Sequence, residues 1–144
     1  MITIDFETYY DKDFSLTKLT TEEYVRDQRF EVIGVAVKVN DGVTEWFSGD
    51  FQQTAIWLRQ FDWENQFVLA HNAMFDSAIL TWHFGIKPKA WLDTLCMARA
   101  TLGVNTSMSL AKLTEHFGLG AKGTEVNDAK GFRRLDFSPE HLAQ

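Results

Sequence analysis

The stretch MITIDFETYY, residues 1–10, places two acids, Asp5 and Glu7, one position apart in a largely apolar run. Successive side chains of a strand point to opposite faces, so Asp5 and Glu7 share one face while Phe6 turns to the other. Neighbouring carboxylates repel each other, and burying them unpaired is costly. The stretch therefore predicts a first strand over residues 2–7, with a proton or a cation between its two acids.

The Asp-x-Glu pattern also occurs at Asp62 and Glu64, in a polar stretch typical of a loop. An exposed edge strand with two solvated acids would give the same letters as a metal site. The metal interpretation of Asp5 and Glu7 therefore needs support from the rest of the chain.

The composition predicts one globular domain over residues 1–144, because 45% of the residues are hydrophobic and 14% are aromatic. Every apolar run is shorter than the roughly 18 residues of a membrane span, and Asp5 comes too early for a secretory signal. The single cysteine, Cys96, excludes an intramolecular disulfide and a cysteine metal cluster. We expect a cytoplasmic protein without a membrane partner.

The charge is unevenly distributed along the chain. The net charge is −6, but residues 1–76 hold 14 acids and 6 Lys/Arg, whereas residues 77–144 hold 6 acids and 8 Lys/Arg. The first part suits divalent cations and the second suits a phosphate backbone, although an ordinary solvated surface explains the charge equally well.

The order of elements predicts an α/β fold. Residues 31–39 and 43–49 form a hairpin around Asp41-Gly42, because Asp-Gly between β-rich runs is a strong turn signal. Thr20 and Glu23 form a capping box for a short helix. The later elements are a strand at 67–72 and helices at 54–61, 75–85, 93–102 and 109–117. Together they indicate a mixed sheet with helices packed against it.

The stretch AHNAMFD, residues 70–76, is a second candidate for the site. A buried strand ends at Asn72, and Asp76 falls in the first turn of the next helix. Loops that follow strands are where α/β proteins place their sites, and the helix dipole favours an ionised Asp76, as a metal ligand must be. The alternative is an ordinary carboxylate at the start of a helix.

Taken together, the two stretches resemble the first two motifs of the DEDD 3′→5′ exonuclease superfamily. The segments DFET, HNAMFD, LDTLCMA and SLAKLTEHFGLGAKG look most like the proofreading exonuclease at the start of phage-type family A DNA polymerases, and the resemblance covers nearly the whole chain. It implies a ribonuclease H-like mixed sheet, with early antiparallel strands and then a parallel strand. It also implies an acidic pocket that holds two Mg²⁺ or Mn²⁺ ions.

The resemblance assigns roles to individual residues. It implies that Asp5, Glu7 and Asp76 are the catalytic residues and the metal ligands. The residues expected to bind nucleic acid are Thr8, Tyr9, Asn72 and Phe75. Two of these have alternatives, since Asn72 could instead tie down its loop and Phe75 could belong to the core.

The fourth motif of this superfamily is missing from the sequence. It would place a Tyr or His four residues before an Asp, but the late acids Asp128, Asp136 and Glu140 have neither at that spacing. Ser138 begins a further helix close to the end of the sequence. We therefore expect a chain cut before its closing helix, which folds but is weak or inactive as a nuclease.

Several other conspicuous residues are expected to be structural. We expect His71, His83 and His116 to be packed and hydrogen-bonded, Asp93 to cap a helix, and Trp46 to lie in the core or at its rim.

The main hypothesis is a proofreading 3′→5′ exonuclease domain that degrades the 3′ end of single-stranded DNA. Its partner would be the polymerase domain of the same parent chain, in the host cell cytoplasm if the protein is phage-encoded. The alternatives are a non-catalytic module that binds nucleic acid or a partner protein, and a free-standing RNA-trimming exonuclease of the same superfamily.

Overall fold

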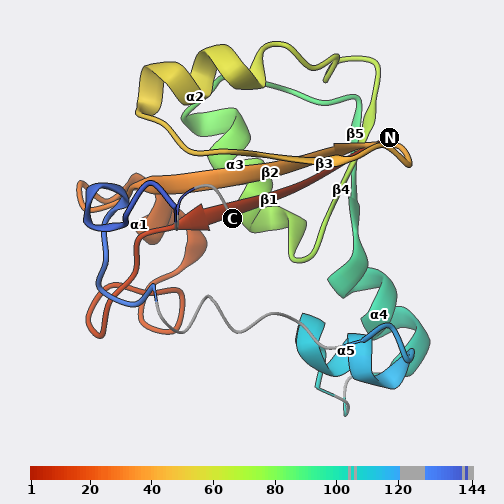
Figure 1. The fold of residues 1–144 in the computed structure, drawn as a ribbon. Coiled ribbons are helices and arrows are strands. Elements are labelled where there is room, and N and C mark those ends of the chain that lie inside the picture. Colours follow the sequence, from red (N-terminus) through yellow and green to blue (C-terminus); the bar gives the residue numbers. More distant parts are fainter. Residues whose placement is uncertain (104, 106, 121–128, 141, 143–144) are drawn as a thin grey trace.

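The structure is a computed structural model that describes residues 1–103, 105, 107–120, 129–140 and 142. A five-stranded sheet in the order β3-β2-β1-β4-β5 forms its centre. Strands β1, β2 and β3 pair antiparallel, and β1, β4 and β5 pair parallel (Figure 1). The strands are β1 (Ile2–Thr8), β2 (Val32–Val39), β3 (Thr44–Phe47), β4 (Phe67–Ala70) and β5 (Ala90–Asp93). The helices are α1 (Thr21–Arg26), α2 (Phe51–Leu58), α3 (Ala73–Trp82), α4 (Thr94–Leu102), α5 (Leu110–His116) and the 3₁₀ helix η2 (Arg134–Asp136).

The two faces of β1 differ as its alternating sequence predicts. Ile2, Ile4 and Phe6 are buried in the hydrophobic core, to which α1, α2 and α3 also contribute side chains. The opposite face of β1 carries Asp5 and Glu7. The side chains of the core therefore fix which way the two acids point.

The register extends this second face across the neighbouring strand. Asp5 is paired with Ala36 of β2, and Glu7 with Gly34. Residues opposite each other in an antiparallel pair lie on the same face, so small β2 residues flank both acids. Helices α4 and α5 lie beyond the end of β5, set apart from the sheet (Figure 1).

Some predicted boundaries were wrong. Helix α2 begins at Phe51 instead of residue 54, because Asp50 and Gln53 form a capping box. Helix α3 spans Ala73–Trp82 instead of residues 75–85, although Asp76 still lies in its first turn. The strand β5 was missed, since its four residues carry no clear alternation. The hairpin turn and the capping box of Thr20 and Glu23 are confirmed.

The described residues include no helix that is long and apolar enough to cross a membrane.

Candidate active site

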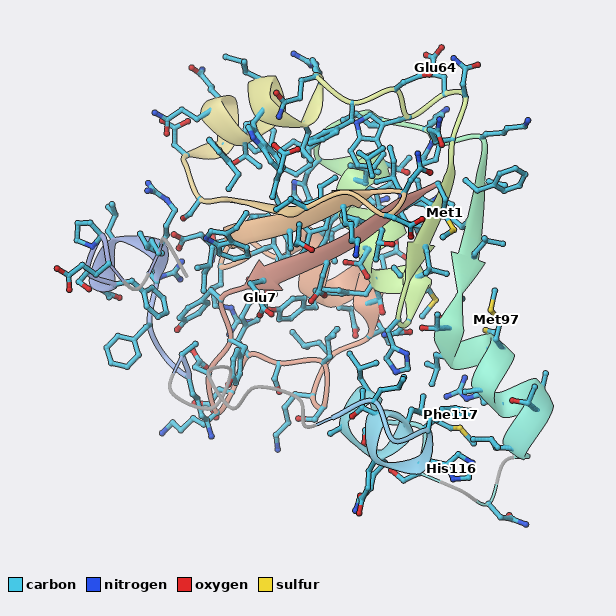
Figure 2. The ribbon with its side chains drawn as sticks, turned by 45° about the vertical axis from the view of Figure 1, so that its right-hand side comes forward. Met1, Glu7, Glu64, Met97, His116 and Phe117 are labelled. Atoms are coloured by element: carbon cyan, nitrogen blue, oxygen red, sulfur yellow. The ribbon has the colours of Figure 1, made fainter. Side chains whose placement is uncertain are left out.

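The carboxylates of Asp5 and Glu7 lie toward the carboxyl end of β1. Asp5 is exposed and Glu7 is half-buried. Figure 2 shows Glu7 near the tip of the β1 arrow, whereas Glu64 lies toward the other end of the molecule, nearer Met1. The second Asp-x-Glu pair is thus remote from the first. Asp62 lies in the same loop as Glu64, and its carboxylate accepts a hydrogen bond from the Asn65 side chain, which makes it a suitable control residue.

Asp76 is the buried member of the candidate site. Its side chain is on α3, the residue is only 2% exposed, and its Oδ1 accepts a hydrogen bond of 3.1 Å from the Phe6 N–H. Strand β4 pairs with β1 only at Ile2 and Thr3, so the edge of β1 beyond these residues is open to α3. The hydrogen bond therefore attaches α3 directly to the part of β1 that lies between Asp5 and Glu7.

The electrostatics of Asp76 link it to the other two acids. Burial is the largest of the effects that raise the pKa of Asp76 to about 8; the Phe6 N–H opposes it, and the negative charges of Asp5 and Glu7 act in the same direction as burial. At neutral pH and without a bound cation, the Asp76 carboxyl would hold a proton. A cation at the same place would favour the ionised form instead.

The three side chains all offer carboxylate oxygens, which are the ligands that a hard divalent cation prefers. The charges of Asp5 and Glu7 both act on the buried Asp76 carboxyl. The carboxylate oxygens are not arranged as a complete coordination shell. Within the residues that the structure describes, no group of three or more His, Cys, Asp or Glu side chains is arranged to hold a metal ion. The metal-ligand roles of Asp5, Glu7 and Asp76 therefore stay a prediction.

Asn72 lies at the junction between β4 and α3 in a left-handed conformation, with φ 68° and ψ 54°. Asparagine tolerates this conformation better than most residues do. The Asn72 N–H donates to Asp93 Oδ1 at 3.0 Å, and the same oxygen accepts the Leu95 N–H at 2.9 Å. Partial burial opposes the effect of these hydrogen bonds, but the net result is a lowered pKa of Asp93. The backbone of Asn72 thus ties down the loop, and its side chain makes no capping bond.

Asp93 therefore does more than the sequence indicated. The predicted helix cap is confirmed, but the carboxylate also holds the loop before α3 and so connects two parallel strands at their carboxyl ends. The second role depends on a contact between residues 21 positions apart, so the local sequence gives no sign of it.

Of the three histidines that were predicted to be packed and hydrogen-bonded, His71 and His83 have the expected bonds. His71 Nδ1 lies 2.9 Å from Thr94 Oγ1, and its Nε2 lies 3.1 Å from the Met108 carbonyl oxygen. His83 Nε2 donates to the Val25 carbonyl at 2.8 Å. The prediction is wrong for His116, which is exposed near the end of α5 beside Phe117 (Figure 2).

Three residues predicted to bind nucleic acid also have structural contacts. Thr8 Oγ1 lies 2.9 Å from the Tyr24 hydroxyl, which itself donates to the Tyr9 carbonyl. The Tyr9 side chain is buried in the core, and its hydroxyl donates to Asp11 at 2.6 Å. Phe75 is partly buried against the core, with its ring 6.0 Å from that of Tyr24.

The structure describes two of the three late acids considered for a fourth carboxylate. Asp136 is exposed, and its carboxylate accepts the Arg133 N–H at 2.8 Å to close η2. Glu140 is exposed in a turn. Asp128 lies outside the described residues. The segment before η2 nevertheless approaches the carboxyl end of β1, because the Gly131 N–H donates to the Tyr10 carbonyl at 2.8 Å.

Comparison with known proteins identifies the class. The family model DNA_pol_A_exo1, described as a 3′-5′ exonuclease, matches residues 14–129. The chain belongs to this 3′-5′ exonuclease family, which confirms the resemblance to the DEDD superfamily. The matched range includes Asp76 and begins after Asp5 and Glu7.

Solved structures confirm the ribonuclease H-like fold. Brucella melitensis NrnC is similar with a TM-score of 0.64 and 16% identity, and a structure titled "apo form of the nuclease" has a TM-score of 0.63 and 18% identity. Brucella melitensis NrnC bound to pGG has a TM-score of 0.58 and 15% identity. Each match covers 98% of this chain and 62% of the other, so the chain spans less than two thirds of their length. A comparison with the curated proteins gives no match.

Proposed function

We propose that this chain is the proofreading 3′→5′ exonuclease domain of a DNA polymerase and hydrolyses the terminal phosphodiester of single-stranded DNA. The observation that carries the proposal is the buried Asp76 carboxyl, hydrogen-bonded to β1 between Asp5 and Glu7, in a chain of the 3′-5′ exonuclease family. The polymerase would be its partner in the same parent chain. The exposed thiol of Cys96 suits a reducing compartment such as the cytoplasm.

The three carboxylates would hold Mg²⁺ or Mn²⁺, two ions in the complete site. Such ions acidify the attacking water and stabilise negative charge on the leaving 3′ oxygen. Asp5 and Asp76 would be the main ligands, and Glu7 would also orient the water. Asp76 must lose its proton for this role, which couples metal binding to pH.

Thr8 is proposed to hold the terminal nucleotide. The Tyr24 hydroxyl has one proton, which it donates to the Tyr9 carbonyl, so the Thr8 hydroxyl donates to Tyr24. Thr8 Oγ1 then keeps acceptor capacity for a donor such as the 3′-hydroxyl of the strand. The Asn72 side chain is proposed to face the same nucleotide, and the partly buried Phe75 would support the site from the core side.

A second candidate function is a free-standing RNA-trimming exonuclease of the same superfamily. It is favoured by the similarity to NrnC structures, one of which is bound to pGG. A third is a module that binds a nucleic acid or a protein partner without cleavage.

The test is a polarity and product assay with a 5′-labelled DNA oligonucleotide and an RNA of the same sequence, in Mn²⁺ and at high protein concentration. Asp5→Asn is the site variant and Asp62→Asn is the matched control. We expect slow, stepwise shortening of the DNA from its 3′ end, with release of nucleoside 5′-monophosphates, in line with the weak activity expected of this chain. This activity is lost in Asp5→Asn and kept in Asp62→Asn.

Each other result points to a different function. Preference for RNA would replace the polymerase assignment by the RNA-trimming one. Binding of the oligonucleotide without any product would favour the non-catalytic module. Cleavage that survives in Asp5→Asn would remove this carboxylate from the reaction.

A further inference from the structure

Trp46 lies on the same face of the sheet as the acids of β1. Asp5 is paired with Ala36, and Ala36 is paired with Trp46 of β3. Directly paired residues share a face, so Trp46 is on the side of the sheet that carries the candidate active site.

Gly34 brings the indole ring closer to the acids. A Cβ atom placed on Gly34 would lie 2.2 Å from Cζ2 and 2.3 Å from Cη2 of Trp46, so the ring fills the space that a side chain would need. Gly34 is the residue of β2 paired with Glu7. Paired Cα atoms are about 5 Å apart, so the indole reaches across β2 to the immediate neighbour of Glu7.

The hydrophobic core does not account for the position of Trp46. Trp46 belongs neither to the buried core nor to the partly buried residues packed against it. The next residue, Phe47, points to the other face and stacks on Trp57, with ring centroids 5.1 Å apart. Trp46 remains partly exposed, and its Nε1–H donates to the Leu142 carbonyl at 2.5 Å. One edge of the indole is thereby fixed in place.

We propose that Trp46, lying over Gly34, is a stacking platform for a nucleobase of the strand whose 3′ end lies at Asp5, Glu7 and Asp76. The proposal rests on the proposed function. A base is the part of a nucleotide that suits this position, because it is flat and uncharged and stacks on an aromatic ring. Stacking of this kind tolerates any base, which a proofreading site requires.

The test measures binding of single-stranded DNA by fluorescence anisotropy, with terminal phosphorothioate linkages to slow cleavage. The variants are Trp46→Ala and Trp46→Phe. Trp82→Ala is the matched control, since Trp82 is exposed on α3 with the Arg26 guanidinium 4.3 Å from its ring centroid. A series of oligonucleotides carries one abasic position at each of the last few nucleotides in turn.

We expect Trp46→Ala to weaken binding of the intact oligonucleotide by roughly 5- to 100-fold, Trp46→Phe by less, and Trp82→Ala not at all. At one abasic position the wild type and Trp46→Ala should bind equally, because the stacked base is already missing. If Trp46→Ala lost the same factor of affinity for every oligonucleotide in the series, the stacking platform would be overturned and Trp46 would have a structural role.

Thermal unfolding of each variant separates stacking from folding. If Trp46→Ala unfolds, Trp46→Phe carries the comparison, because it retains a flat aromatic ring and loses only the larger indole surface and the N–H that donates to Leu142. Cleavage of DNA with unchanged binding by both Trp46 variants would keep the proposed function and overturn the platform. A base-dependent loss of binding in a chain that cleaves nothing would support the platform and overturn the nuclease assignment.

Discussion

Replacement of Asp76 by asparagine is expected to stabilise the protein at neutral and higher pH. The ordinary pKa of an aspartate is 3.8, and that of Asp76 in the folded chain is raised to about 8, mainly by burial. The folded chain therefore keeps a proton at pH 7 that the unfolded chain has lost. Each pH unit between the ordinary pKa and neutrality lowers the free energy of unfolding by about 1.4 kcal/mol. Over roughly three units, the free energy of unfolding at pH 7 is therefore ~4 kcal/mol lower than it is at low pH.

The sign follows from the raised pKa. The stabilisation that the protonated Asp76 provides is complete below about pH 4 and is lost as the pH rises through about 8. The amide that Asp76→Asn introduces has nearly the same shape as the carboxyl and can accept the Phe6 N–H through its oxygen, but it cannot ionise. The variant should therefore lose this part of the pH dependence.

The assay is urea unfolding in EDTA at several pH values between about 4 and 9. We expect the free energy of unfolding of the wild type to fall by up to ~1.4 kcal/mol per pH unit in this window, relative to Asp76→Asn. Asp62→Asn should follow the wild type, because Asp62 is exposed. A parallel pH dependence in the wild type and Asp76→Asn would refute the raised pKa.

Three further predictions concern metal binding, the contacts of Asp93, and the close approach of the Trp46 ring to Gly34. The affinity for Mn²⁺, measured by calorimetry, should rise with pH toward about 8, since binding displaces the Asp76 proton; a pH-independent affinity would contradict this. Asp93→Ala should cost ~1–2 kcal/mol in urea unfolding, because α4 loses its cap and the Asn72 N–H loses its acceptor; no loss would show that the backbone bonds are dispensable. Gly34→Ala should cost ~1–3 kcal/mol and change the fluorescence of Trp46, which a Cβ would displace; an unchanged spectrum would contradict the close contact.

Local patterns allowed much of the fold to be predicted. The alternation of residues 2–7 put Asp5 and Glu7 on one face, and the position of Asp76 in the first turn of a helix was also correct. The boundaries of α2 and α3 depended on capping and loop geometry, and β5 was too short to show alternation.

The site was harder to predict where it depends on contacts between distant segments. The hydrogen bond from the Phe6 N–H to Asp76 joins residues 70 positions apart. Burial of the Asp76 carboxyl raises its pKa, so the group is protonated at neutral pH and not ionised as expected. The sequence argument favoured an ionised Asp76 from the helix dipole, but desolvation is the larger effect. Trp46 is partly buried, as expected for a residue at the rim of the core, but only the register relates it to Gly34 and Glu7.

The central claim is that Asp5, Glu7 and Asp76 act together as one divalent-metal site. Electron paramagnetic resonance tests it most directly, since the signal of free Mn²⁺ falls when the protein binds the ion. We expect the wild type and Asp62→Asn to bind Mn²⁺ equally, and Asp5→Asn to lose this binding. Equal binding by all three proteins would contradict the claim, because the ion would then be held elsewhere on the chain.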